Sequence, residues 1–312
     1  MTRHLRSLLD LSAVEVAHLL DLAMDVKKDP AAFGDRLAGR SVAMIFAKPS
    51  TRTRVSFEVG LRQLGANPLF LPAGGATGLQ LNRGESNHDT AKVMSRFVDA
   101  IVIRTFAQAQ VEALAEHGSI PVVNALTDTY HPCQALADML TMRERFGTTK
   151  GQTLVYVGPG NNVTSSLMLA GPRGGFDVVC GCPDDLPPDP EVLAMAQAEA
   201  DKAGTKVTVE ADPVKAVAGA KVIYTDTWVS MGQEDEAKAL IARLEPYRVT
   251  PDLMNAAADD AVFMHCLPAH RGEEVAAEVI DGPRSIVFDE AENRLHAQKA
   301  LMLLLMGGAP WS

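Results

Sequence analysis

The chain has 312 residues and a formal net charge of −10, with 47% hydrophobic and 22% charged residues. This length is typical of two domains, and the composition is that of a globular protein with enough apolar material for two cores. The acidic balance argues against a general binder of nucleic acids or anionic membranes, although a few arginines gathered in one place can still bind a small anion.

The amino-terminal segment and the cysteines indicate the cellular compartment of the protein. Residues 8–20 are apolar but are interrupted by Asp10, Glu15 and His18, so they do not resemble the core of a signal peptide. No apolar run reaches the ~20 residues of a membrane span. The cysteines form no CxxC pair and no metal-ligand spacing; they are Cys133, Cys180, Cys182 and Cys266. The sequence therefore predicts a cytoplasmic protein without a metal site.

Short apolar segments alternate with helical patterns in the first half of the chain. Strands are expected at residues 41–47, 69–71, 100–103 and 121–124. Helices are expected at residues 53–64, 85–97 and 110–116. This alternation predicts a mainly parallel sheet with helices on both faces.

A second series of the same kind follows a helix at residues 134–145 and a polar connection at 146–152. Strands are expected at residues 153–157, 177–180, 206–209, 222–225, 262–264 and 286–288. Helices are expected at residues 165–169, 191–202, 237–245 and 250–257, and a long final helix at 290–306. The predicted fold is therefore α/β with two domains, each a mainly parallel sheet flanked by helices.

A polar and basic segment, Lys48-Pro49-Ser50-Thr51-Arg52-Thr53-Arg54, lies where the first strand ends and a helix begins. The unpaired N–H groups of a helix start favour an anion. Hydroxyl groups add donors, and guanidinium groups add charge and a planar fork that suits phosphate oxygens. Alone, such a segment is more often a helix cap followed by a solvated basic turn.

Four segments in order make the sequence similar to the aspartate and ornithine carbamoyltransferases. The resemblance covers nearly the whole chain, from about residue 8 to residue 305. Its segments are Ser50-Thr51-Arg52-Thr53-Arg54, Arg104-Thr105-Phe106, His131-Pro132-Cys133-Gln134 and His265-Cys266-Leu267-Pro268. Each segment is a weak signal alone, but four segments in order at matching structural places are a strong one.

The resemblance implies a site for carbamoyl phosphate. Arg104, His131 and Thr53 would donate to the carbonyl oxygen as negative charge grows on it, and Gln134 would accept from the carbamoyl NH2. The other residues that the resemblance assigns to this substrate are Ser50, Thr51, Arg52, Gln80, Cys266, Leu267 and Arg294.

The acceptor is indicated by Asp226-Thr227-Trp228-Val229-Ser230-Met231-Gly232, which resembles the Asp-x-x-x-Ser-Met-Gly loop of ornithine carbamoyltransferases. Asp226 and the Ser230 hydroxyl suit an α-ammonium group. The Met231 backbone N–H and Asn162 suit an α-carboxylate. The δ-amine must lose a proton before it attacks, since its pKa should be ~10.4 like that of lysine. The resemblance makes Cys266 and Asp226 candidates to relay that proton.

A glycine-containing turn, Gly158-Pro159-Gly160-Asn161-Asn162, precedes the first helix of the second half. A dinucleotide-binding fingerprint would require a third glycine where Val163 stands. The turn instead resembles the Gly-Asp-x-Asn-Asn turn of ornithine carbamoyltransferases, with Pro159 in the usual acidic position.

The resemblance also implies the organisation of the protein. Residues 1–134 with 291–312 would bind carbamoyl phosphate and residues 135–290 would bind ornithine, with the chemistry in the cleft between them and the final helix returning to the first domain. The products would be citrulline and phosphate, in arginine metabolism, with no metal or organic cofactor. The loop around Gln80 would cross into a neighbouring subunit's site, which implies a trimer or a multiple of trimers.

Three alternatives remain open from the sequence. A carbamoyltransferase could use aspartate, putrescine or an acylated ornithine as its acceptor, although Asp226 with Ser230 and Met231 fits none of them as well. A dinucleotide-dependent dehydrogenase is disfavoured by the incomplete glycine pattern. A non-catalytic phosphate-binding homologue is disfavoured by the intact set of Arg104, His131, Gln134 and Cys266.

Overall fold

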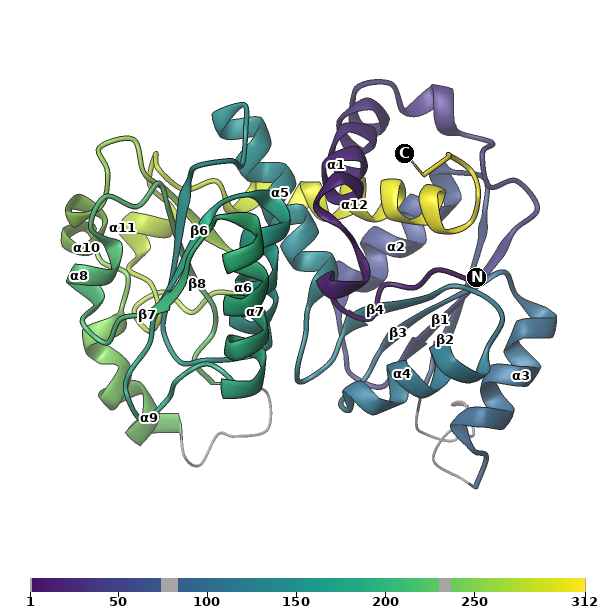
Figure 1. Cartoon of the computed structure of the whole chain (residues 1–312), viewed down its shortest axis with the longest axis horizontal. Helices are drawn as coiled ribbons and strands as arrows, with labels where there is room; N and C mark the ends of the chain where they lie inside the picture. The colour runs from purple at the N-terminus through teal and green to yellow at the C-terminus, as the bar shows by residue number, and fades with distance from the viewer. Residues whose placement is uncertain (1, 74–83, 230–236, 312) are drawn as a thin grey trace. The chain divides into compact units, whose positions relative to one another are not determined.

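The computed structural model describes residues 2–73, 84–229 and 237–311. The chain forms two compact units (Figure 1): unit 1 comprises Met1–Leu140 and Glu292–Ser312, and unit 2 comprises Thr141–Ala291. Gln80, Ser230 and Met231 lie outside the described residues. The division of function between the two domains stays a prediction.

Unit 1 contains a parallel sheet with the strand order β2-β1-β3-β4. Its strands are β1 (Ser41–Phe46), β2 (Asn67–Pro72), β3 (Ala100–Arg104) and β4 (Val122–Leu126). The two central strands, β1 and β3, are almost entirely buried, which explains their continuous apolar sequence: a parallel sheet is covered on both faces.

The helices of unit 1 cover this sheet. They are α1 (Ala13–Lys28), α2 (Thr51–Gln63), α3 (Asn87–Phe97), α4 (Gln108–His117) and α5 (Pro132–Phe146), which continues into unit 2. Short 3-10 helices lie at Leu8–Asp10 and Pro30–Phe33. Ala43, Ile45, Ile101 and Ile103 form one apolar core with residues of α3 and α4.

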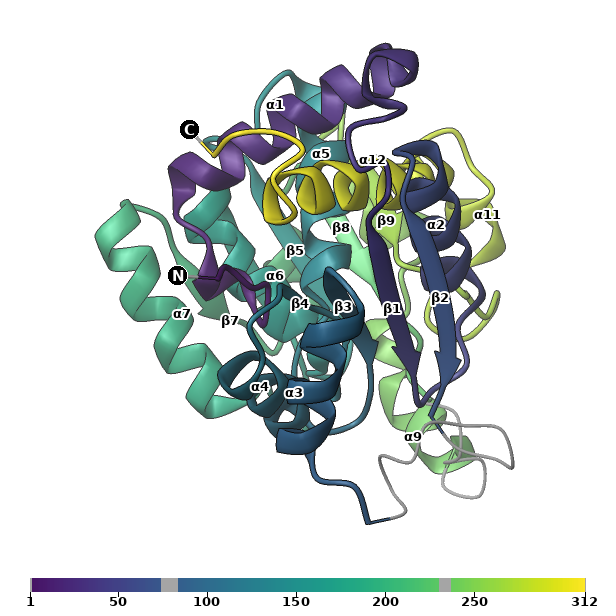
Figure 2. The same ribbon diagram turned by 90° about the vertical axis from the view of Figure 1, so that its right-hand side faces the viewer.

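The last helix, α12 (Val287–Leu305), belongs mainly to unit 1. It runs alongside α1 and α2 (Figures 1 and 2). Lys27 of α1 donates to Asn293, and Gln63 of α2 accepts from Lys299. The predicted return of the carboxy-terminal helix to the first domain is confirmed.

Unit 2 contains a second parallel sheet with the order β7-β6-β5-β8-β9. Its strands are β5 (Thr153–Val157), β6 (Asp177–Gly181), β7 (Val207–Val209), β8 (Val222–Thr225) and β9 (Val262–His265). Its helices are α6 (Asn162–Gly174), α7 (Pro190–Ala203), α8 (Pro213–Val217), α9 (Ala237–Leu244), α10 (Pro251–Ala256) and α11 (Ala277–Ile280), with a 3-10 helix at Glu245–Tyr247. The two α/β units confirm the predicted fold class.

One predicted element is wrong. Residues 286–288 do not form a strand, because only Ser285 bridges to Phe263 and α12 already begins at Val287. Phe288 is 72% exposed, and Asp289 and Glu290 occupy the first turn of the helix. Acidic side chains in a first turn favour a helix start, and this preference outweighs the short apolar run.

Each sheet has a point where the direction of winding reverses. In unit 1 this point lies between β1 and β3, and in unit 2 between β5 and β8. Ligands of open α/β sheets bind beyond the carboxyl ends of the strands at such points. Ser50 and Arg104 follow or end the strands at the first point, and Asn162 and Asp226 follow the strands at the second.

Among residues 2–73, 84–229 and 237–311, no helix has both the length and the apolar character needed to cross a bilayer.

Candidate active site

The start of α2 forms one side of the site in unit 1. Ser50 is the N-cap: its hydroxyl oxygen accepts the Thr53 N–H at 3.2 Å, so α2 begins two residues earlier than the sequence predicted. Thr51 is exposed, Arg52 is half-buried and Thr53 is buried. The first-turn N–H groups that lack partners within a helix therefore lie beside hydroxyl and guanidinium groups, an arrangement suited to an anion.

Arg294 joins three elements of unit 1 at the centre of the site. Its guanidinium donates to Thr53 Oγ1 of α2 at 3.1 Å and to Gln134 Oε1 of α5 at 2.7 Å. Its Nε donates to Gln298 Oε1 at 3.1 Å, one turn further along α12. Arg294 is only 2% exposed, and three acceptors hold its guanidinium group in place. Three predicted residues, far apart in the sequence, are thus in direct contact.

Gln134 is oriented by a second hydrogen bond. Its Nε2 donates to Asp138 Oδ1 at 2.9 Å, one turn further along α5. Because the oxygen of this amide faces Arg294 and its nitrogen faces Asp138, the two partners determine which way the amide points.

His131 lies just before α5 and is buried. Burial lowers its pKa well below the usual 6.5, and the positive charges of Arg294, Arg104 and Arg52 lower it further. The imidazole is therefore neutral at physiological pH. A neutral ring can still donate one N–H to a carbonyl oxygen, and the same three arginines would stabilise negative charge there.

Two other cations of unit 1 have different partners. Lys48 pairs with Asp128, and its Nζ lies 4.3 Å from the centre of the Phe106 ring. Arg54 faces Glu58 at 3.6 Å and stacks over the Phe70 ring at 3.7 Å. Arg52, and not Arg54, is among the charges that act on His131. Arg54 is thus engaged with Glu58 and Phe70, while Arg52 belongs to the charges around His131.

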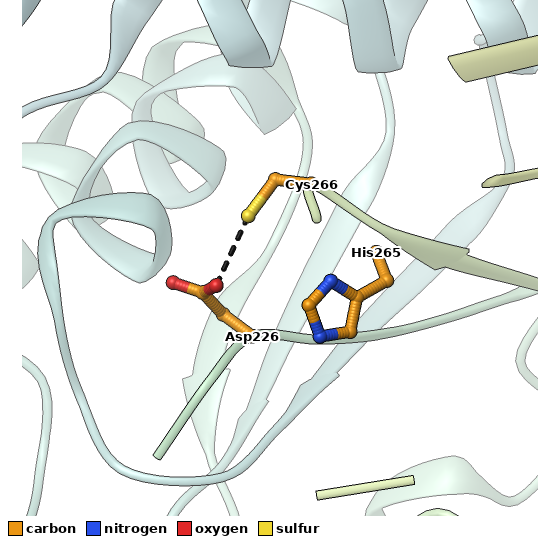
Figure 3. A group of neighbouring side chains, drawn as sticks. All are labelled: Asp226, His265 and Cys266. Atoms are coloured by element: carbon orange, nitrogen blue, oxygen red, sulfur yellow. Dashed lines mark hydrogen bonds between the residues drawn. The ribbon is translucent and has the colours of Figure 1, made fainter. Parts of the chain in front are cut away.

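Asp226 is the centre of the site in unit 2. Its Oδ1 accepts the Cys266 thiol at 3.0 Å, as Figure 3 shows, and the Thr227 N–H at 2.8 Å. These residues follow β8 and β9, which are neighbours in the sheet. The predicted pair for proton relay is therefore in direct contact.

Asn161 is a residue of this site that the sequence interpretation missed. Its Nδ2 donates to Asp226 Oδ2 at 2.9 Å, and its Oδ1 caps α6 by accepting the N–H groups of Val163 and Thr164. The signal was an asparagine between a strand and a helix, which is typical of an N-cap. Asn162, the predicted ligand for a carboxylate, is the first residue of α6 and is half-buried.

The loop after β9 is held by a buried histidine. The Leu267 N–H donates to His265 Nδ1 at 2.8 Å, so Nε2 is the ring nitrogen that donates, and it faces Glu274 Oε1 at 3.3 Å. His265 and Glu274 are both fully buried. The contact helps to keep Leu267 at a φ of 55°, in the left-handed region.

Asp226, His265 and Cys266 also place possible metal ligands within 4.8 Å of one another (Figure 3). Both ring nitrogens of His265, however, face partners from the protein, Leu267 and Glu274. The group is therefore better suited to holding a proton on the Cys266–Asp226 pair than to binding an ion.

The fold and these side chains define a class of protein: a two-unit α/β chain with arginines around a buried histidine in one unit and a carboxylate–thiol pair in the other. The family model described as "Aspartate/ornithine carbamoyltransferase, carbamoyl-P binding domain" matches residues 3–144. The model of the "Asp/Orn binding domain" of the same family matches residues 150–305. The chain therefore belongs to the aspartate/ornithine carbamoyltransferase family.

Individual relatives point to one branch of that family. The chain is 58% identical to an ornithine carbamoyltransferase of Symbiobacterium thermophilum over 96% of each chain. It is 53% identical to one of Methanothermobacter thermautotrophicus over 98% of this chain and 99% of the relative. The solved structure of ornithine carbamoyltransferase from Pyrococcus furiosus matches with a TM-score of 0.94 and 50% identity, covering 99% of this chain and 98% of that one.

Proposed function

We propose that this chain is an ornithine carbamoyltransferase, which transfers the carbamoyl group of carbamoyl phosphate to the δ-amine of L-ornithine. The products are L-citrulline and phosphate, and the reaction belongs to arginine metabolism. The observation that carries the proposal is Asp226, which meets the Cys266 thiol with one oxygen and Asn161 with the other. An anionic group at this place suits the α-ammonium of ornithine and repels the extra carboxylate of aspartate.

Carbamoyl phosphate would occupy the site of unit 1. Ser50, Thr51 and Arg52 would bind its phosphate, together with the first-turn N–H groups of α2. Arg104, His131 and Arg294 would face the carbamoyl group and donate to its carbonyl oxygen, which gains negative charge as the carbon becomes tetrahedral. Gln134 would accept from the carbamoyl NH2.

Ornithine would occupy the site of unit 2. Asp226 and Ser230 would bind the α-ammonium, and Asn162 with the Met231 N–H the α-carboxylate. The δ-amine gives up a proton, attacks the carbonyl carbon and forms the new C–N bond. The C–O bond to phosphate then breaks, and phosphate leaves with the electron pair. Cys266 and Asp226 are the proposed route for the proton, and backbone carbonyls at Cys266 and Leu267 would hold the remaining N–H groups.

Citrulline formation tests this proposal. Purified enzyme is supplied with carbamoyl phosphate and either ornithine, N-acetylornithine, putrescine or aspartate, and each carbamoylated product is measured. Ornithine should react fastest, because the other amines lack the α-ammonium, lack the α-carboxylate or carry a second carboxylate. Equal rates with putrescine or N-acetylornithine would overturn the choice of acceptor while leaving the carbamoyl phosphate site in place.

We further propose that the protein is a cytoplasmic trimer, or a multiple of trimers, in which Gln80 of one subunit reaches the carbamoyl phosphate site of the next. An open hollow of about 750 Å³ lies beside Ser50 and Thr51 and is lined in part by Arg54, Glu58 and Phe70. In this proposal the neighbouring subunit's Gln80 would enter there. Mixing Gln80→Ala and Arg104→Ala enzymes after reversible dissociation should restore activity. Mixed assemblies that stay inactive despite confirmed subunit exchange would contradict the shared site.

A further inference from the structure

We infer that Asn161 is a positioning residue that aims Asp226 at the α-ammonium of the acceptor amino acid. This inference rests on the proposed function, because it concerns the acceptor half of the same reaction. It assigns to Asn161 a role distinct from that of Asn162, which we propose as a direct ligand of the carboxylate.

The orientation of the Asn161 amide is fixed by its surroundings. Its Oδ1 accepts two backbone N–H groups at the start of α6, from Val163 at 2.9 Å and Thr164 at 3.0 Å. An NH2 group turned toward those donors would lose both hydrogen bonds. The nitrogen of the amide must therefore face Asp226, and the helix start holds it there.

The Asp226 carboxylate is left with one direction in which to accept a further donor. A carboxylate offers about four acceptor positions, two on each oxygen. Among the contacts of the described residues, Oδ1 accepts from the Cys266 thiol and the Thr227 N–H, and Oδ2 accepts from Asn161. The remaining position is on Oδ2, so an ammonium group that approaches there leaves the thiol contact on Oδ1 intact.

This division explains how one carboxylate can serve two purposes. Oδ1 keeps the thiol proton, and Oδ2 takes the charge of the substrate. Without Asn161 only the contacts of Oδ1 with Thr227 and Cys266 would hold the carboxylate, so Oδ2 could turn away from the substrate and the two purposes would compete. Asn161 also belongs to the same helix start as Asn162, so the ligands for the α-ammonium and the α-carboxylate are placed by one structural element.

Two substitutions at this position separate positioning from helix capping. Serine and aspartate are both good N-cap residues, so Asn161→Ser and Asn161→Asp keep an acceptor for α6 while removing the donor to Asp226. Asp189 provides a matched control: it caps α7 through the N–H groups of Glu191 and Val192, and neither is part of the proposed site. Asp189→Ser should leave the kinetics unchanged.

Steady-state kinetics give the first readout. Asn161→Ser should lower kcat/KM for ornithine about tenfold to a hundredfold, as expected for the loss of a hydrogen bond to a charged group. The KM for carbamoyl phosphate and the thermal midpoint should match those of Asp189→Ser. Asn161→Asp should lose more, because two carboxylates would then face each other. Wild-type ornithine kinetics in both variants, or an equal loss in Asp189→Ser, would overturn the inference.

Alkylation of Cys266 gives a second readout that does not depend on citrulline formation. Cys133, Cys180 and Cys182 are buried and serve as internal references. Asn161→Ser should speed alkylation by iodoacetamide, because a carboxylate that can rotate away no longer keeps the thiol protonated. Asn161→Asp should slow it by adding negative charge. An enzyme that makes no citrulline but shows these opposite shifts would refute the proposed function and retain the Asn161–Asp226 link; unchanged alkylation in both variants would refute the link.

Discussion

The two candidate sites occupy equivalent places in their sheets but are built in different ways. The site in unit 1 is a cluster of arginines around a neutral histidine, held together by the buried fork of Arg294. The site in unit 2 is a chain of hydrogen bonds from Asn161 through Asp226 to Cys266. The site in unit 1 suits the binding of an intact anion. The site in unit 2 suits the binding of a cationic group and the transfer of a proton.

Loss of the charge at Asp226 should be the most damaging single change. Asp226→Asn should reduce kcat/KM for ornithine by about 2–5 kcal/mol of transition-state stabilisation, as for the truncation of a buried charge pair. Binding of a non-reactive carbamoyl phosphate analogue, measured by calorimetry, should be unchanged because Asp226 belongs to unit 2.

The substrates separate the two roles of Asp226. If it only anchors the ammonium, the variant should lose its preference for ornithine over N-acetylornithine while both rates stay measurable. If it also relays the proton, both substrates should become slow. Normal ornithine turnover in Asp226→Asn would remove Asp226 from the site.

Substitution of Arg104 tests whether the site in unit 1 stabilises the transition state. Arg104→Ala should lower kcat by about 3 kcal/mol, the typical loss of one donor to a developing oxyanion. The KM for carbamoyl phosphate should change less, because the charge on the carbonyl oxygen exists only during the reaction. A large increase in KM with an unchanged kcat would instead make Arg104 a ground-state ligand.

Arg52 and Arg54 form a natural pair for a smaller test. Arg52→Ala should weaken carbamoyl phosphate binding by about 1.5–3 kcal/mol, since a bound anion loses a charged partner. Arg54→Ala should have little effect on the affinity, because Arg54 is engaged with Glu58 and Phe70. Calorimetry on both variants decides this, and an equal loss of affinity in the two would contradict the assignment of different roles.

The smallest expected effect is the pH dependence contributed by His131. Its pKa is lower in the folded protein than the 6.5 of the unfolded chain, so the unfolded state binds the proton more readily. The free energy of unfolding should therefore fall as the pH drops below 6.5, by at most about 1.4 kcal/mol per pH unit for this one group. Burial lowers the pKa values of His4 and His296 as well, and they add to the trend in the same direction.

Urea unfolding at pH 7.5 and pH 5.5 measures this contribution. In His131→Gln, the free energy of unfolding should depend less steeply on pH, because only the contribution of the other histidines is retained. A slope in His131→Gln as steep as that of the wild type would show that the proton taken up on unfolding goes elsewhere.

Several elements could be predicted because their signals are local. The strand at residues 41–46 is a short apolar run, and α2 begins at a serine cap. Helix α1 was missed although Ser12 and Glu15 form a capping box, a pattern that can be read from the sequence. The expected strand at 286–288 is wrong because its signal, a short apolar run, is outweighed by the acidic first turn of α12.

The alternation of strands and helices, the basic turn at Ser50 and the family motifs can be predicted from the sequence alone, because each depends on residues a few positions apart. The folded structure sets the contacts of Arg294 with Thr53 and Gln134, and that of Asn161 with Asp226. Those contacts join residues from 65 to 241 positions apart. Hydrogen bonds of this kind depend on the order of strands in a sheet and on which face a helix presents, and the local sequence pattern determines neither.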